Sequence, residues 1–270
     1  MPATITMDRL PSNGDELFGH IDRLLLEADR FVAVAAAGPL DAPIANCPGW
    51  TMRDLVEHVG MVHLWAAANM AFPSSEWIAV DGLATLEHYW PDLASESRPP
   101  RDLFAWYAAT LDRLIDVIRS MPRDHDCLTF LPASSPLVMW ARRQAAEVGV
   151  HRYDAESARG LHSEFDPRFA IDMLDELLMG FAPKMRSADS SRERVLLIEA
   201  EDVGERYTVR IAPGGIATVR GGDTGHLHLT GSAADLNLLL WNRPSGSTIR
   251  KDGDADALQL WADSCCIRWI

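Results

Sequence analysis

Apolar side chains recur at three- and four-residue steps through the first 160 residues, a spacing that is typical of amphipathic helices. The spacing predicts four long helices, over residues 15–37, 51–71, 101–121 and 136–159. Thr51 is expected to start the second helix as an N-cap with Asp54 as its capping-box partner, and Gly160 to end the fourth. Four long helices joined by loops of mixed length predict a helix bundle with an apolar core.

The pattern then changes to short, alternating, β-branched runs that are typical of strands. A helix is predicted at 167–183, strands at 194–200, 205–212, 216–220 and 226–230, and further helices at 232–241 and 254–263. Glycine-rich segments between the strands mark turns. The sequence therefore predicts an α+β protein of two domains. These are a four-helix bundle over residues 1–163 and a small α+β domain, with a short sheet and helices, over residues 164–270.

Three polar residues lie where the helical period predicts the bundle core. His58 is in line with Leu55 and Val62 on the second helix, and Glu147 and His151 are one turn apart on the fourth. A buried carboxylate or imidazole is costly unless it is paired or binds a cation. Two histidines and a glutamate from facing helices form a three-ligand set for zinc or a similar divalent ion. The fourth position stays open for water or substrate, as in catalytic sites.

The same spacing also permits an interpretation without a metal. A single histidine on an apolar face is more often a hydrogen-bonded core residue than a ligand. A glutamate followed by a histidine four residues later is often a solvated ion pair. The helical period alone leaves both interpretations open.

Composition narrows the class of protein. The chain has 25 Lys and Arg against 39 Asp and Glu, a formal net charge of −14. This balance excludes a generic nucleic-acid binder, which needs a basic surface to neutralise phosphates. The N-terminus lacks the pattern of a secretory signal, and no apolar run approaches the ~18 residues of a membrane helix. The four cysteines form no C-x-x-C motif. We expect a cytoplasmic protein that binds neither nucleic acid nor membranes.

Several local motifs carry a resemblance to a known family. Residues 46–66 contain C-P-G-W-T, then D-L, then a histidine with a glycine two positions later. Residues 147–160 follow E-x-x-x-H-R-x-D-A-E-x-A-x-G. Further matches are TGSAADLNLLLWNR at 230–243 and KDGDADALQLWAD at 251–263. The chain resembles the mycothiol-dependent maleylpyruvate isomerase family over nearly its whole length.

The resemblance implies a fold, a metal site and a reaction. It implies a DinB/YfiT-like metal-binding bundle, with His58, Glu147 and His151 as ligands of a divalent metal. Zinc is the default for this set, and nickel or iron are alternatives by ligand type. The resemblance also implies mycothiol, the cysteinyl pseudodisaccharide thiol of actinobacteria, as cosubstrate. The metal would activate the thiol as a thiolate nucleophile, which adds to the cis double bond of maleylpyruvate and is eliminated from the trans product.

Further residues are candidates for binding the thiol or the substrate. Because the protein has a net charge of −14, an anionic substrate requires arginines in the binding site to neutralise it. Arg243, where the resemblance places an arginine, and Arg152 are the candidate catalytic residues. Arg53 and Asp154 are the candidate cofactor-binding residues. Asp154 either accepts the other ring N–H of His151 or forms an exposed ion pair.

Three functions stay open at this stage. The first is a maleylpyruvate isomerase-like cis–trans isomerase, acting as a monomer or homodimer on an electrophilic small molecule. The second is a mycothiol S-transferase that conjugates or exchanges the thiol on a xenobiotic or natural-product intermediate. The long segments at 72–100 and 122–136 favour a larger pocket and therefore this second function. The third is a non-catalytic module that binds a small molecule. The presence of all three metal-ligand candidates argues against this third function.

Other conspicuous side chains are expected to have structural or supporting roles. Cys47 is expected to have a packed structural role, and His63 to lie on the surface or to support the site from a different helix face. Trp50 and Trp65 are expected in the core. No role is assigned to the adjacent cysteines at 265 and 266.

Overall fold

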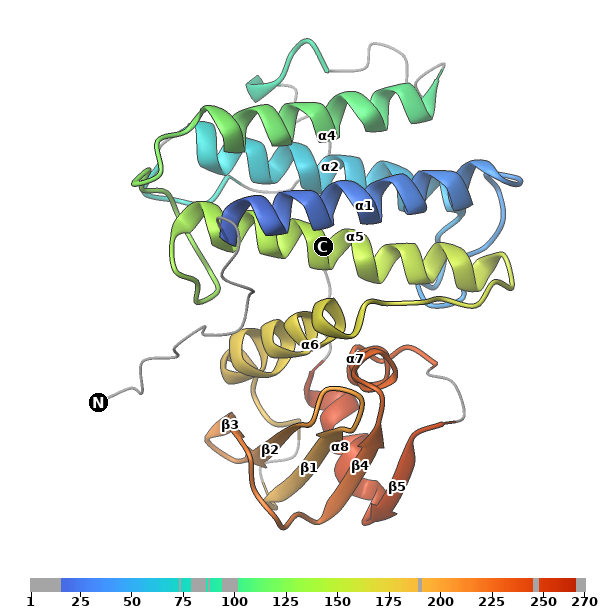
Figure 1. Ribbon diagram of the computed structural model, residues 1–270, viewed down its shortest axis with the longest axis vertical. Helices are drawn as coiled ribbons and strands as arrows, with labels where there is room; N and C mark the ends of the chain where they lie inside the picture. The colour runs from blue at the N-terminus through green and yellow to red at the C-terminus, as the bar shows by residue number, and fades with distance from the viewer. Residues whose placement is uncertain are drawn as a thin grey trace. The chain divides into compact units, whose positions relative to one another are not determined.

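The computed structural model describes residues 16–72, 74–78, 86, 88–93, 102–188, 191–244 and 248–265. These residues form two compact units that divide between Ser163 and Glu164. Helices alone build the first unit, and a five-stranded sheet with helices builds the second (Figure 1). The predicted two-domain α+β fold is confirmed. Most of the long segment at 72–100 lies outside the described residues, as does Cys266.

The first unit is a bundle of four long helices. They are α1 (Glu16–Ala36), α2 (Met52–Ala71), α4 (Leu103–Ser120) and α5 (Pro136–Ala158). Helix α1 packs mainly on α5, and α2 packs on both α4 and α5. Each helix begins and ends within two residues of its prediction. Helices α1 and α4 each bury one apolar stripe, whereas α2 and α5 are buried on most sides.

Local hydrogen bonds fix the ends of these helices. The Thr51 hydroxyl accepts from the Asp54 backbone N–H, and the Asp54 carboxylate accepts from the Thr51 backbone N–H at 2.8 Å. The predicted capping box is therefore confirmed. Helix α5 starts behind a Ser135 cap and ends before Gly160, whose φ of +67° is the left-handed conformation that glycine adopts at a C′ position.

A glycine allows α2 and α4 to approach each other closely. A Cβ atom at Gly60 would lie 2.4 Å from Cζ3 of Trp106 and 3.2 Å from the hydroxyl of Thr110. Both neighbours are buried on α4. Any side chain at Gly60 therefore forces the indole to move.

We expect Gly60→Ala to lower the free energy of unfolding by about 1–3 kcal/mol, the usual range for overpacking a core. This cost exceeds the gain of up to ~1 kcal/mol from replacing glycine by alanine in a helix. Gly19→Ala on α1 is the matched control, because its new Cβ meets nothing within 4 Å. The control is expected to stabilise by about 0.5–1 kcal/mol. Urea unfolding followed by circular dichroism measures both, and equal effects at the two positions would contradict the packing argument.

The second unit begins with a helix and continues into the sheet. Helix α6 (Pro167–Asp175) runs into a π-helical turn, η1 (Glu176–Phe181), and a short 3-10 turn, η2 (Ala182–Lys184). The strands are β1 (Arg194–Ala200), β2 (Glu205–Ala212), β3 (Gly215–Arg220), β4 (Leu227–Gly231) and β5 (Arg250–Gly253). Helices α7 (Ala233–Leu240) and α8 (Ala255–Ser264) complete the unit.

The sheet has the order β3-β2-β1-β4-β5. Strands β1 and β4 are parallel, and the other neighbouring pairs are antiparallel. The four predicted strands are present, whereas β5 was not predicted. All four residues of β5 are exposed, so its sequence RKDG carries none of the apolar alternation by which a strand is recognised.

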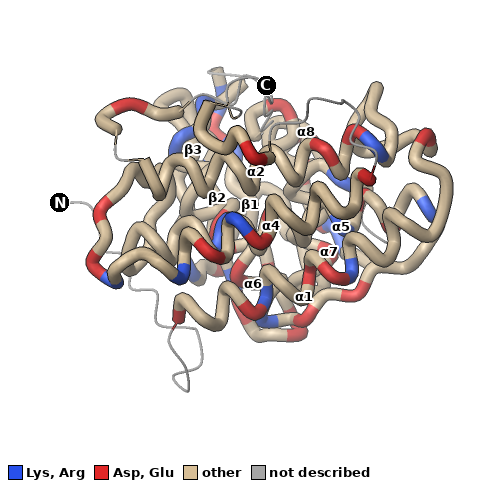
Figure 2. The backbone as a smooth tube through the Cα atoms, turned by 90° about the horizontal axis from the view of Figure 1, so that it is seen from above, with Lys and Arg blue, Asp and Glu red and all other residues tan. Residues whose placement is uncertain are grey.

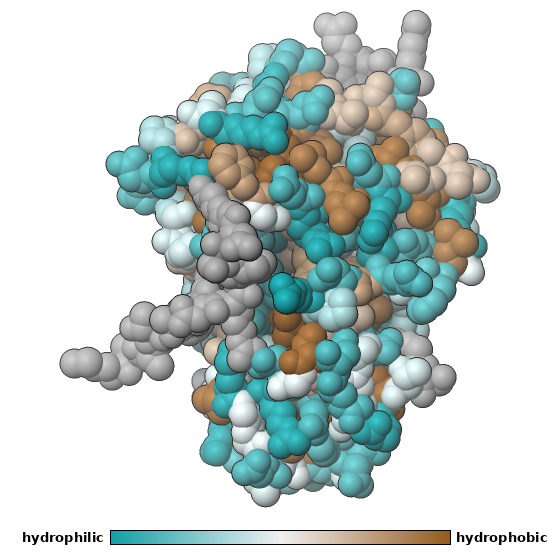
Figure 3. Space-filling view, in the orientation of Figure 1, coloured by the Kyte–Doolittle hydropathy of each residue, from teal (hydrophilic) through white to brown (hydrophobic). Residues whose placement is uncertain are grey.

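Charged residues occur throughout the described parts of the chain. Basic residues are interspersed among more numerous acidic ones (Figure 2), and hydrophobic residues reach the surface of the helical unit among hydrophilic ones (Figure 3). The large exposed apolar side chains come from different elements, such as Phe18 on α1 and Val219 on β3. Among the described helices, none combines the length and the apolarity that a membrane span requires.

Candidate metal centre

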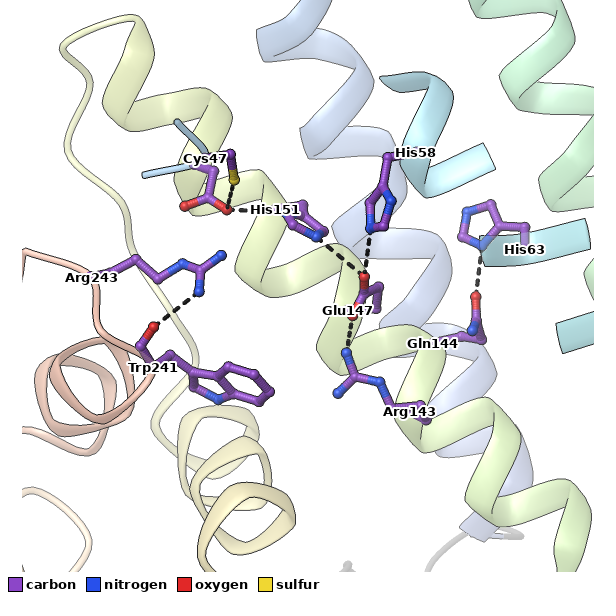
Figure 4. A network of polar contacts seen from close by, with 10 residues as sticks. Cys47, His58, His63, Arg143, Gln144, Glu147, His151, Trp241 and Arg243 are labelled. Carbon is purple, nitrogen blue, oxygen red and sulfur yellow. Dashed lines mark hydrogen bonds and ion pairs between the residues drawn. The ribbon is translucent and has the colours of Figure 1, made fainter. Parts of the chain in front are cut away.

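Two facing helices bring the three predicted ligands together. His58 comes from α2, and Glu147 and His151 come from adjacent turns of α5 (Figure 4). The three residues are 8%, 3% and 6% exposed, so all of them lie in the bundle interior. The helical period placed them on the inner faces correctly.

The ligand atoms converge on one position. The Nε2 atoms of His58 and His151 each lie 3.2 Å from the same oxygen, Glu147 Oε1. All three donor atoms lie within 4.8 Å of one another. Neighbouring donors on a tetrahedral zinc ion with bonds of 2.0–2.1 Å are separated by about 3.3 Å. The spacing and the nitrogen and oxygen donors therefore fit zinc or a divalent ion of similar size.

The electrostatics of the cluster depend on a fourth residue, Arg143. Its guanidinium pairs with Glu147 Oε2 from one turn earlier on α5, and both side chains are buried. Burial by itself would raise the pKa of Glu147, but Arg143 and the two imidazoles hold that pKa well below its usual value. Burial likewise opposes the charged form of His151, yet its contacts with Asp154, Cys47 and Glu147 raise its pKa well above the ordinary value. Burial lowers the pKa of His58.

A second layer of hydrogen bonds orients His151. Its Nδ1 lies 3.0 Å from Asp154 Oδ2, which leaves Nε2 directed at Glu147. Asp154 in turn accepts from the Asn46 amide at 3.0 Å and from the Cys47 thiol at 3.6 Å. Asp154 is 1% exposed, so it forms this buried contact and not an exposed ion pair. Carboxylates in this position fix the tautomer and orientation of metal-binding histidines.

Family models match residues in both units of the chain. The family model of the mycothiol maleylpyruvate isomerase N-terminal domain matches residues 22–156, which is half of the chain. A second model, the MDMPI C-terminal domain, matches residues 168–260. The chain belongs to the mycothiol maleylpyruvate isomerase family. The first match spans all three candidate ligands.

Solved structures show the fold of this family. The crystal structure of the mycothiol-dependent maleylpyruvate isomerase matches with a TM-score of 0.61 and 18% identity, over 91% of this chain and 95% of that one. A structure of the same enzyme with a histidine replaced by alanine matches with a TM-score of 0.62 and 17% identity, over the same shares. At this identity the likeness shows a shared fold. No curated protein matches the chain.

Two side chains of this mycothiol maleylpyruvate isomerase family member lie in places other than those predicted. His63 is fully buried, with Nδ1 2.8 Å from Gln144 Oε1. Of the two alternatives predicted for it, the surface location is therefore wrong, and support of the site from a different helix face stays a prediction. Burial lowers its pKa to about 4, and the ring is neutral at pH 7. Trp50 is half-buried, and its ring centroid lies 4.8 Å from that of His58 and 6.5 Å from that of His151. It lies against the ligands and not in the core.

Arg152 has a different environment from the one expected of a substrate-binding arginine. The side chain is 1% exposed, and its guanidinium donates to Glu27 at 2.6 Å and to Glu156 at 2.7 Å. Two carboxylates already surround this cation, and burial separates it from solvent. The contacts therefore argue against a direct role in binding an anionic substrate, and for a role in joining α1 to α5.

The other two candidate arginines lie in different units. Arg53 is half-exposed on α2, with Nη1 3.9 Å from the Glu57 carboxylate. Arg243 follows α7, which ends in a Schellman motif. Asn242 adopts a φ of +59°, and the Arg243 backbone N–H donates to the Leu238 carbonyl at 2.9 Å. The Arg243 side chain donates to the Trp241 carbonyl at 3.0 Å (Figure 4).

Proposed function

We propose that this protein is a divalent-metal-dependent, mycothiol-dependent enzyme that isomerises a cis double bond in an electrophilic small molecule of the maleylpyruvate type. The observation that carries the proposal is the convergence of His58, Glu147 and His151 in a member of this family. A bound divalent metal would supply the positive charge that keeps a thiol ionised at neutral pH. Zinc is the proposed metal, because two histidines and a carboxylate are a common zinc set.

The residues of the chain have distinct tasks in this reaction. Asp154 keeps the hydrogen on Nδ1 of His151, so that Nε2 is directed at the site. Burial of the three ligands limits bulk water around the cluster, which strengthens its electrostatic interactions. We propose that Arg243 binds a carboxylate of the substrate, since guanidinium groups pair with carboxylates through two hydrogen bonds. We propose that Arg53 binds the thiol cosubstrate through its N–H donors.

The reaction itself balances without an external oxidant or reductant. The thiolate sulfur bonds to one carbon of the double bond, and the electron pair of that bond moves to the conjugated carbonyl as an enolate. Rotation about the new single bond follows. The enolate then re-forms the double bond in the trans geometry and expels the thiolate. Mycothiol is therefore regenerated, and the reducing cytoplasm is the compartment we infer for such a free thiol.

A mycothiol S-transferase is the second candidate, and an aromatic cluster favours it. Trp65 and Trp140 lie seven residues, about two turns, from His58 on α2 and from Glu147 on α5. The connecting segments add Trp77 and Phe130, whose rings lie 5.7–6.1 Å from that of Trp65 or Trp140. Trp77 is 42% exposed. Accessible aromatic surface of this kind suits an apolar electrophile larger than maleylpyruvate.

Incubation with mycothiol and two kinds of electrophile tests the proposal. The isomerase is expected to convert maleylpyruvate to its trans isomer without consuming thiol, as measured by the change in ultraviolet absorbance. The transferase is expected to consume one thiol per molecule of a bromobimane probe. A metal-loaded, folded protein that does neither would contradict both functions and favour a ligand-binding module.

A further inference from the structure

The two oxygens of Glu147 face different partners. Oε1 meets both imidazoles, at 3.2 Å from each Nε2, whereas Oε2 pairs with the guanidinium of Arg143. An arginine on the second oxygen competes with any cation for that oxygen. The carboxylate therefore has one oxygen available to the metal position.

Arg143 also places a permanent charge beside the site. Its side chain is 2% exposed and that of Glu147 is 3% exposed, so water screens the pair poorly. Arginine stays protonated at any physiological pH. The positive charge of the guanidinium cancels the negative charge of the Glu147 carboxylate. The net charge of the site with a divalent metal would therefore equal the double positive charge of the metal. Without Arg143 the same site would carry one positive charge fewer.

We propose that Arg143 holds Glu147 in one-oxygen coordination and biases the metal centre toward an anionic ligand, such as a thiolate, over a neutral one. This inference rests on the proposed function, since it needs a divalent metal at the three ligands. A buried cation beside the site disfavours binding of the metal itself. The inference explains why Arg143 nevertheless lies one turn from Glu147, which the metal is expected to bind. Arg143 is in this sense a positioning residue that acts through Glu147.

Cobalt(II)-substituted protein tests the inference without measuring turnover. Visible absorbance of the cobalt reports the binding of thiocyanate, an anionic probe, and of imidazole, a neutral probe, at fixed pH. We expect Arg143→Met to keep cobalt and to raise the thiocyanate Kd about tenfold, while the imidazole Kd changes less than about twofold. Arg143→Lys keeps the charge and is expected to recover most of the thiocyanate affinity. Arg30→Met, at an exposed position on α1, is the matched control and should leave both constants unchanged.

The outcomes separate this inference from the proposed function. Wild-type protein that binds no cobalt contradicts the metal site itself. Cobalt-loaded Arg143→Met with an unchanged thiocyanate Kd overturns the role of Arg143 alone, as does an Arg143→Lys variant as weak as Arg143→Met. A purely structural role would weaken both probes together. If Arg143→Met loses its helical circular dichroism, Arg143→Gln, which keeps N–H donors without the charge, replaces it in the same assay.

Discussion

His151→Ala is expected to lower the affinity of the protein for zinc more than 100-fold, since loss of even an outer-shell partner costs 10–100-fold. The variant removes one of three converging donors and also leaves Asp154 without its imidazole partner. Helix α5 should survive, because alanine favours helix and the apolar contacts of α5 with α1 remain. Competition with a chromogenic chelator measures the affinity, and circular dichroism checks the fold.

Two further measurements sharpen this expectation. Because the metal-free pKa of His151 is raised, a proton competes with the metal for the ring, and zinc affinity should fall as the pH is lowered. Asp154→Asn, which removes only the outer charge, is expected to cost 10–100-fold. His162→Ala, at an exposed position, is the control and should bind zinc as the wild type does. Equal affinities of His151→Ala and wild-type protein would contradict the metal site.

The sequence predicted the positions of the candidate ligands better than their surroundings, and helix α5 shows why. A prediction from helical periodicity assumes that a helix buries one face. Glu147 and His151 were predicted because they lie on the face of α5 that contacts α2. Helix α5 is buried on almost every side from Leu137 to Arg152. In such a helix the apolar period no longer indicates which polar residues point inward. Arg143 was missed for this reason, although its position four residues before Glu147 was a usable signal.

Contacts between distant segments were beyond the local pattern as well. Asn46 and Cys47 reach Asp154 across more than 100 residues, so no spacing in the sequence could reveal that the loop before α2 supports His151. The fold followed from periodicity where elements bury one face. The strand β5 was not predicted, because none of its residues is buried. The π-helical turn after α6 was not predicted either, because it continues the apolar pattern of an ordinary helix.

Arg152→Met is expected to lower the free energy of unfolding by about 3–5 kcal/mol, the usual cost of removing one partner from a buried ion pair. Arg152 is enclosed by Glu27 on α1 and Glu156 on α5, and the three side chains are between 0% and 11% exposed. Methionine preserves much of the side-chain volume, so the loss reports the removal of the buried guanidinium from Glu156 and from Glu27, which retains Arg23 at 3.5 Å. Urea unfolding of the wild type and the variant measures the difference.

A double variant and a kinetic measurement decide between this structural role and substrate binding. Adding Glu156→Gln to Arg152→Met removes a largely buried carboxylate charge that has lost its pairing with Arg152, and it should restore part of the lost stability. A structural Arg152 predicts that the folded fraction of Arg152→Met keeps the wild-type KM. An arginine that binds substrate predicts the reverse, an unfolding free energy within about 1 kcal/mol of wild type together with a raised KM. That second result would return Arg152 to the substrate site and remove the buried ion triad as the link between α1 and α5.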